Sequence, residues 1–300
     1  MNKDADNYED GYLKVNGIKI YYKRYGKGNR HKLMTLHGGP GASHDILLPL
    51  TDLVGHDYDI LFYDQSGCGK SEDPKDDNDY TFRHGIEEAN IVRDQVFGDH
   101  PINLLGESYG GAMALAYAIK YQDKLRTVIS VSGFSSNSRR VSETLRLISL
   151  LPEKYLQAMI SAANTNNYNS ESFLEAYGYF YKKHIFRVSP SPKEYEDSIK
   201  MMNERKAHAK MLGTNPLGTD GTMKGIEFTA DLDRIRIPTL ILSGKYDMIT
   251  PEISEEIHSR IKNSEIFIFG ESSHNAIWEV TERFMEVVDS YIKKHDGYST

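Results

Sequence analysis

The chain has almost no cysteine. Its 300 residues contain one, Cys68, so an internal disulfide framework and a multi-cysteine zinc or iron–sulfur site are both excluded. We expect Cys68 to be a packed thiol without a catalytic role, because no partner histidine is indicated. No histidine pair has the H-E-x-x-H spacing of a zinc-binding helix, and the sequence therefore predicts no metal site.

Long apolar runs are also missing. No stretch of 18 apolar residues occurs, so we expect no membrane-spanning helix. The first dozen residues are acidic and polar, without the apolar core of a signal peptide. We therefore expect a soluble, cytoplasmic protein. The net charge of −7 argues against nucleic-acid binding, which depends on neutralising phosphates.

Strand and helix patterns alternate through much of the chain. Residues 12–22 alternate in polarity around Asn16-Gly17, a strong hairpin signal. Further strands are expected at 32–36, 59–63, 102–105, 127–131, 239–242 and 265–269, and helices at 86–97, 109–121, 251–261 and 280–294. This order predicts an α/β fold with a mostly parallel twisted sheet and helices on both faces.

The alternation stops over residues 134–225, which have helical patterns and many tyrosines and methionines. This segment contains 13 Lys and Arg against 9 Asp and Glu, a net +4, whereas the remainder carries −11. We therefore expect two domains: a core of residues 1–133 and 226–300, and an inserted helical cap of residues 134–225. The alternative is that these helices only extend the outer layer of the sheet.

The segment Gly106-Glu107-Ser108-Tyr109-Gly110 matches G-x-S-x-G. It follows an apolar strand pattern and precedes a helical one, which is the context of a nucleophile elbow. Its glycines suit a tight turn that presents the serine hydroxyl at the end of the strand. Ser108 is therefore the predicted nucleophile, and a serine in an ordinary strand–helix turn is the alternative.

A serine hydroxyl needs a base, and the base needs a group that orients it. His274 follows the last predicted strand, and Asp247 follows the strand before it. This gives the chain order serine, acid, histidine that is typical of the architecture. The alternative role for Asp247 is to cap the helix that begins near Pro251.

An oxyanion hole requires backbone N–H donors beside the nucleophile. We expect one from Tyr109, the residue after Ser108. The second should come from the loop after the third strand, His37-Gly38-Gly39-Pro40-Gly41, and Gly39 is the predicted donor.

The segment from Asp64 to Ser71 ends in Gly-Lys-Ser and so resembles the end of a phosphate loop. A phosphate loop would require glycine at position 64, where aspartate stands. We expect this loop to brace the floor of the active site.

Together, these motifs resemble the proline iminopeptidase family of α/β-hydrolases. The family pattern is carried by HGGPG at 37–41, D-Q-x-G-x-G-x-S at 64–71, G-x-S-Y-G-G at 106–111, Asp247 and His274. The resemblance implies an α/β-hydrolase fold and a cytosolic serine hydrolase that removes N-terminal residues, often proline, from short peptides without a cofactor. It also implies association with a larger protease system.

Two positions depart from the family pattern. Family members bind the free α-amino group of the substrate with acidic side chains, whereas Met248 and Pro216 occupy those positions here. Glu107 and Glu227 are candidate substitutes. If neither substitutes, we expect a weak preference for free-amine substrates. The alternative function is then a carboxylesterase or amidase acting on small acyl substrates. A non-catalytic binding protein is a third reading.

Aromatic residues cluster in the predicted cap. The cluster consists of Tyr177, Tyr179, Phe180, Tyr181 and Phe186, and we expect one or two of these side chains to line an apolar pocket for the substrate's first side chain. Tyr179 and Phe180 are the chosen pocket residues. The alternative is that this cluster packs the interior of the cap.

Overall fold

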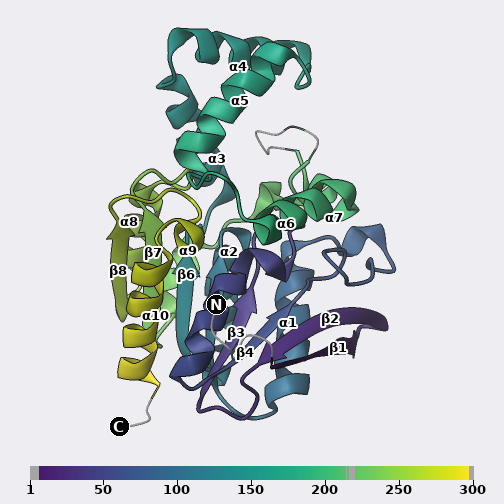
Figure 1. Ribbon diagram of the computed structural model, residues 1–300, viewed down its shortest axis with the longest axis vertical. Helices are drawn as coiled ribbons and strands as arrows, with labels where there is room; N and C mark the ends of the chain where they lie inside the picture. The colour runs from purple at the N-terminus through teal and green to yellow at the C-terminus, as the bar shows by residue number, and fades with distance from the viewer. Residues whose placement is uncertain (1–6, 214, 216–219, 297–300) are drawn as a thin grey trace.

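An eight-stranded sheet runs through the computed structural model, which describes residues 7–213, 215 and 220–296 (Figure 1). Its order is β1-β2-β4-β3-β5-β6-β7-β8. The strands are β1 (Tyr8–Val15), β2 (Ile18–Tyr25), β3 (His31–Leu36), β4 (Tyr58–Tyr63), β5 (Ile102–Glu107), β6 (Leu125–Val131), β7 (Thr239–Gly244) and β8 (Ser264–Phe269).

The N-terminal hairpin and the parallel strands agree with the sequence patterns. Strand β1 pairs antiparallel with β2 through a turn at Asn16 and Gly17, which have φ values of 50° and 82°. Positive φ at both turn residues is what this tight hairpin turn requires. Strand β2 pairs antiparallel with β4, and the remaining neighbours pair in parallel. The predicted mostly parallel sheet is confirmed.

Helices pack on both faces of the sheet. Apolar residues of α1 (Phe82–Phe97), α2 (Tyr109–Tyr121) and α8 (Pro251–Arg260) belong to one buried cluster. A second cluster combines a 3₁₀ helix (His44–His56) with α9 (Ala276–Glu279) and α10 (Thr281–His295). The sheet is therefore the middle of three layers.

The first hairpin is longer than expected, since β1 begins at Tyr8 and β2 ends at Tyr25. Two helices also differ from the sequence-based expectation. The 3₁₀ helix His44–His56 was not predicted, although its buried Ile46, Leu50 and Leu53 recur at helical spacing. Pro49 lies within the segment, and proline is unfavourable inside a helix, so the sequence does not indicate one here. Helix α1 begins four residues before the expected start, because the Thr81 hydroxyl accepts a hydrogen bond from the His84 amide and caps a polar first turn.

Between β6 and β7 the described residues form five α-helices, followed by two short 3₁₀ helices (Thr222–Gly225 and Thr229–Arg234). The α-helices are α3 (Asn137–Ser149), α4 (Glu153–Thr165), α5 (Glu171–His184), α6 (Lys193–Glu204) and α7 (Lys206–Met211). The first three share their own hydrophobic cluster, and α4 and α5 form the lobe at the top of Figure 1. Helices α6 and α7 lie lower, and α6 packs against the 3₁₀ helix.

The register of the central strands brings the predicted site loops together. Leu36 of β3 and Ser130 of β6 both pair with Gly106 of β5, and Val131 pairs with Leu242 of β7. Because these strands are parallel, the loops that follow them emerge at the same edge of the sheet. The residues after β3, β5, β7 and β8 are therefore neighbours in space.

Candidate active site

Ser108 occupies a sharp turn between β5 and α2. Its backbone has φ of 57° and ψ of −118°, a region that side-chain-bearing residues seldom adopt. The turn is tight: a methyl group on Gly106 would collide with the carbonyl of Gly110, and one on Gly110 with the carbonyl of Leu36. Glycine is therefore required on both sides of Ser108, as expected for a nucleophile elbow.

Three predicted residues form a continuous hydrogen-bonded array. The Ser108 hydroxyl lies 2.8 Å from Nε2 of His274, and Nδ1 of His274 lies 2.7 Å from Oδ1 of Asp247. The amide of Ile249 donates to the same Asp247 oxygen at 2.8 Å and fixes the carboxylate. All three residues of the array are buried. The structure thus brings together the predicted nucleophile, base and orienting acid.

The charge state of His274 depends on its carboxylate neighbours. Burial favours the neutral imidazole, but the adjacent Asp247 carboxylate opposes this effect, and Glu107 and Glu279 add to the opposition. The net result raises the pKa of His274 to about 9. A positively charged imidazolium is therefore well stabilised here, as proton transfer from serine requires.

Both predicted oxyanion donors line the cavity beside Ser108. Tyr109 is the first residue of α2, and the N–H groups of a first helical turn have no acceptor within the helix. Gly39 has a φ of 113°, and a methyl group there would lie 2.7 Å from the amide nitrogen of Gly41. The backbone at Gly39 is therefore a conformation for which glycine is needed.

The loop after β4 braces the loop that contains Gly39. The amide of Gln65 donates to Nε2 of His37 at 3.0 Å, and the Gln65 side chain donates to the His37 carbonyl at 2.8 Å. Asp64 accepts hydrogen bonds from the backbone and side chain of His44 and from the amide of Lys70. These bonds match the bracing role expected from the sequence.

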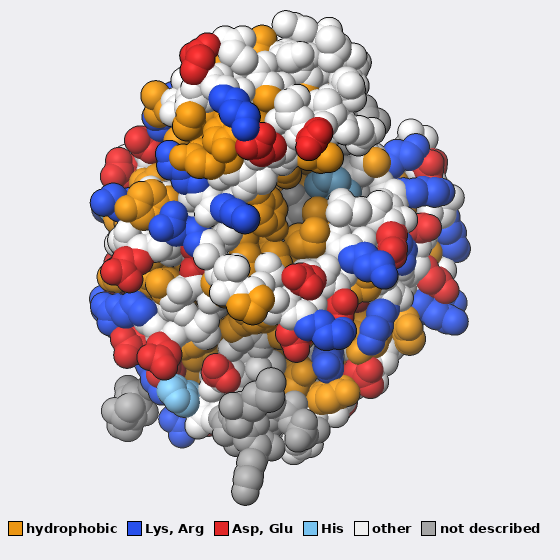
Figure 2. All heavy atoms as spheres, turned by 45° about the horizontal axis from the view of Figure 1, so that its top comes forward, with side chains coloured by type: hydrophobic (Ala, Val, Ile, Leu, Met, Phe, Trp, Pro, Cys, Tyr) orange, Lys and Arg blue, Asp and Glu red, His pale blue; other side chains and the backbone are white. Residues whose placement is uncertain are grey.

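A cavity of about 400 Å³ opens above Ser108. Figure 2 shows a hollow with hydrophobic side chains along it, beneath the lobe that contains α4 and α5. The inserted helices contribute a large part of the lining, with Tyr177 and Tyr181 from α5 and Tyr195, Ile199 and Met202 from α6. This apolar wall suits an uncharged side chain of a ligand.

The predicted pocket residues Tyr179 and Phe180 do not line this cavity, and that prediction is wrong. Tyr179 is 38% exposed, and its ring stacks on Tyr155 at 4.7 Å. Phe180 is buried in the cluster shared by α3, α4 and α5. Tyr177 and Tyr181, four residues apart, lie on the helix face that meets the cavity.

The contribution of α6 to the cavity was not predicted from the sequence. Tyr195, Ile199 and Met202 have the spacing of one apolar helix face, which is the signal that could have found them. Their pattern does not show whether that face meets the sheet, a neighbouring helix or a cavity.

The candidate amine-binding positions have different outcomes. Met248 lines the cavity, and so does Glu107. Glu227 does not line it: its carboxylate accepts from the Thr229 amide at 3.1 Å, beside α1. Pro216 lies outside the residues that the structure describes.

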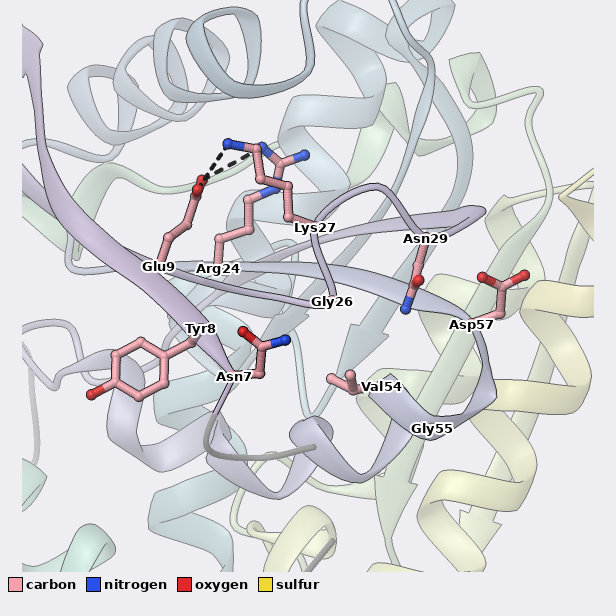
Figure 3. A pocket seen from close by; sticks show the side chains of 10 residues that line it. All are labelled: Asn7, Tyr8, Glu9, Arg24, Gly26, Lys27, Asn29, Val54, Gly55 and Asp57. Carbon is pink, nitrogen blue, oxygen red and sulfur yellow. Dashed lines mark hydrogen bonds and ion pairs between the residues drawn. The ribbon is translucent and has the colours of Figure 1, made fainter. Parts of the chain in front are cut away.

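A second hollow, of about 620 Å³, lies away from Ser108 beside the N-terminal hairpin (Figure 3). In it, Glu9 pairs with Lys27 at 2.8 Å and with Arg24 at 3.8 Å. The described residues that line it include no serine, cysteine or histidine. It therefore offers no counterpart of the array of Ser108, His274 and Asp247.

The described part of the chain has neither a metal-binding cluster nor a membrane-spanning helix. No group of three or more His, Cys, Asp or Glu side chains there could hold a metal ion. None of the helices in the same residues has the length and apolar character needed to cross a membrane.

Comparisons with known proteins agree on the fold. Residues 33–280 match the family described as alpha/beta hydrolase fold. A solved proline iminopeptidase from Mycobacterium smegmatis has a TM-score of 0.91 at 23% identity, covering 96% of this chain and 99% of that chain. The structure of VinJ has a TM-score of 0.90 at 24% identity, covering 96% and 99%. At these identities the likeness shows the fold alone.

Comparison with sequence relatives identifies the family as well as the fold. The proline iminopeptidase of Saccharolobus solfataricus is 45% identical over 95% of this chain and 93% of its own length. That of Thermoplasma volcanium is 43% identical over 96% of this chain and 97% of its own length. Nearly full-length similarity at this level, on the same fold, shows that the chain belongs to the proline iminopeptidase family of α/β hydrolases.

Proposed function

We propose that this protein is a serine aminopeptidase that releases an N-terminal apolar residue, such as proline, from short peptides. The observation that carries the proposal is the hydrogen-bonded array of Ser108, His274 and Asp247 at the floor of an apolar cavity. The relatives named proline iminopeptidase support the substrate class.

In the proposed mechanism, Ser108 Oγ attacks the carbonyl carbon of the scissile bond while Nε2 of His274 takes its proton. Asp247 holds the imidazole through Nδ1 and stabilises the positive charge that develops. The amides of Gly39 and Tyr109 donate to the oxyanion. His274 then returns the proton to the leaving amine, and the C–N bond breaks to leave an ester on Ser108.

Deacylation repeats these roles with water as the nucleophile. His274 takes a proton from the water, whose oxygen attacks the ester carbonyl. Collapse of the second tetrahedral intermediate returns the proton to Ser108 and releases the amino acid. No cofactor takes part in these steps, because only proton transfers and acyl transfer occur.

The cavity supports a small apolar first residue. Its volume of about 400 Å³ is enclosed by aromatic and aliphatic side chains from α5 and α6. We propose that residues 134–225 act as a cap that limits access to short peptides. Cytoplasmic location and association with a larger protease remain predictions from the sequence.

An esterase or amidase of small acyl substrates is the second candidate function. Met248, an uncharged side chain, lines the cavity at a position where the family pattern has an acid. An apolar side chain there provides no negative charge for a substrate ammonium. It therefore imposes no penalty on a neutral acyl group.

A panel of chromogenic proline, leucine and phenylalanine amides, assayed beside short-chain p-nitrophenyl esters, tests the proposal. We expect amide cleavage with proline among the preferred residues, and its loss in Ser108→Ala. Ester cleavage without measurable cleavage of any amino acid amide would favour the second candidate. Full amide cleavage by a pure Ser108→Ala sample would overturn both.

A further inference from the structure

Glu107 is a buried carboxylate that the proposed mechanism leaves without a role. It ends β5, directly before Ser108, and lines the cavity while only 3% exposed. Among the described residues its closest charged partner is His274, with Oε1 3.6 Å from Nε2. In the described part of the chain, no hydrogen bond to the Glu107 carboxylate accompanies this contact. Burying such a carboxylate is costly, and a cation in the cavity would compensate for the cost.

The loop after β3 leaves space for this carboxylate. A methyl group on Gly38 would collide with the Glu107 carboxylate and would lie 3.0 Å from Cβ of Ser108. Only glycine at position 38 therefore accommodates the side chain in this position. Glu107 is held between the oxyanion loop and His274, at the floor of the cavity.

We propose that Glu107 binds the α-ammonium group of the substrate's N-terminal residue. The inference rests on the proposed aminopeptidase function and names the group that selects free N-termini. It replaces the expectation that a chain with Met248 at its amine-binding position discriminates weakly.

The distances suit release of a single residue. Both Glu107 Oε1 and Ser108 Oγ contact His274 Nε2, at 3.6 and 2.8 Å, so they lie no more than 6.4 Å apart. The α-nitrogen of an N-terminal residue is two bonds from the carbonyl carbon that Ser108 attacks. An ammonium at hydrogen-bond distance from Glu107, roughly 2.8 Å, therefore leaves its carbonyl carbon within reach of Oγ.

The surroundings of Glu107 make its charge responsive to a bound cation. Burial raises the pKa of Glu107 to about 7, an effect that His274 opposes and Asp247 reinforces. The Tyr195 hydroxyl interacts with Glu107 from α6, and Arg140 lines the same cavity from α3. An ammonium ligand favours the ionised carboxylate, whereas a neutral acyl substrate favours the protonated acid.

Binding an ammonium would also affect the base. Ionised Glu107 is one of the groups that raise the pKa of His274. A cation beside Glu107 offsets its negative charge, so His274 loses part of its preference for the protonated form. A free-amine substrate would thus increase the fraction of neutral His274 available to accept the Ser108 proton.

Matched substrate pairs test the proposal. The measurement is kcat/KM for prolyl and acetylprolyl p-nitroanilides in wild type, Glu107→Gln and the control Glu227→Gln. We expect wild type to prefer the free amine, and Glu107→Gln to reduce the ratio of the two kcat/KM values by about 10- to 100-fold. Glu227→Gln should keep the wild-type ratio, because Glu227 lies outside the cavity.

Further measurements separate the inference from folding and from the proposed function. Glu107→Asp keeps the negative charge and should restore part of the preference for the free amine. Calorimetry of prolinol binding measures recognition of the amine without turnover, and it compares Ser108→Ala with the double variant Ser108→Ala/Glu107→Gln. An unchanged ratio in folded Glu107→Gln, or a wild-type ratio near one, would overturn the inference. Absence of amide cleavage in wild type would instead overturn the proposed function.

Discussion

The imidazole of His208 in α7 donates a hydrogen bond from Nδ1 to the carbonyl oxygen of Pro40, 2.8 Å away. Burial lowers the pKa of His208, which favours the neutral ring. The contact is close, since a methyl group on Gly41 would lie 2.9 Å from the His208 amide nitrogen. A helix inserted between β6 and β7 therefore holds the loop that contains the proposed oxyanion donor Gly39.

Replacing His208 should weaken catalysis through that loop. We expect His208→Ala to lower kcat about 10-fold with little change in KM, because full loss of one oxyanion donor costs about 100- to 1,000-fold. His208→Asn retains a donor at a similar position and should recover most of kcat. A positioning role would be contradicted if both variants lowered kcat and raised KM by similar factors.

Ser108 stores backbone strain that glycine would relieve. With φ at 57° and ψ at −118°, Ser108→Gly should raise the free energy of unfolding by about 1 kcal/mol while abolishing amide cleavage. Urea unfolding of the variant and wild type measures the difference, with Ser108→Ala as the control that keeps the strain. A glycine variant less stable than the alanine variant would contradict this account.

The proposed triad should act as one unit. Ser108→Ala and His274→Ala should each remove nearly all turnover of prolyl p-nitroanilide, and the double variant should be little worse than either single variant. Active-site titration of each sample excludes contaminating hydrolase. Multiplicative losses in the double variant would show that the two residues work independently.

Selectivity for the first residue should follow the cavity-lining face of α5. Tyr177→Ala should change the ranking of proline, leucine and phenylalanine amides, because this side chain lines the cavity. Tyr179→Ala is the matched control, since that ring stacks on Tyr155 outside the cavity. The ranking by kcat/KM is the readout, and a larger change in the control would place the substrate elsewhere.

The pH dependence should reflect the raised pKa of His274. The base must be neutral to accept a proton, so cleavage of acetylprolyl p-nitroanilide should rise with pH and level off above about 9. Glu107→Gln removes one negative neighbour of His274 and should shift the rising limb of this pH–rate profile to lower pH. A limb that stays in place in this variant would show that Glu107 does not act on His274.

The raised pKa of His274 also makes the stability of the folded state depend on pH. The folded state favours the protonated imidazole, so its stabilising contribution is complete below the ordinary pKa of 6.5 and is lost as pH rises through about 9. His274→Ala should therefore flatten the dependence of unfolding free energy on pH between those values.

The sequence indicates the arrangement of the proposed triad more directly than the lining of the cavity, for a physical reason. Ser108, Asp247 and His274 each follow a strand of a parallel sheet, and such sheets place the loops after their strands at one edge. Only a few residue types can form such an array, and their order along the chain is typical of this architecture.

The pocket follows from helix packing, which local patterns do not specify. Tyr177, Tyr179 and Phe180 are all aromatic, yet one lines the cavity, one is exposed and one is buried in the lobe. Which face of α5 meets the cavity depends on how the lobe sits over the strands. The start of α1 was misplaced for a simpler reason, since its capped first turn is polar.

The attachment of α7 also bears on how this protein can be re-engineered or can diverge. Arg205, directly before α7, donates to the carbonyls of Gly69 and Ser71 in the loop after β4, and His208 donates to Pro40 in the loop after β3. The inserted segment is therefore joined to the core at two loops. Grafting a relative's insertion onto this core would change the reaction rate as well as substrate choice. We therefore expect a change of specificity made by replacing this protein's inserted helices to require replacement of the two loops as well.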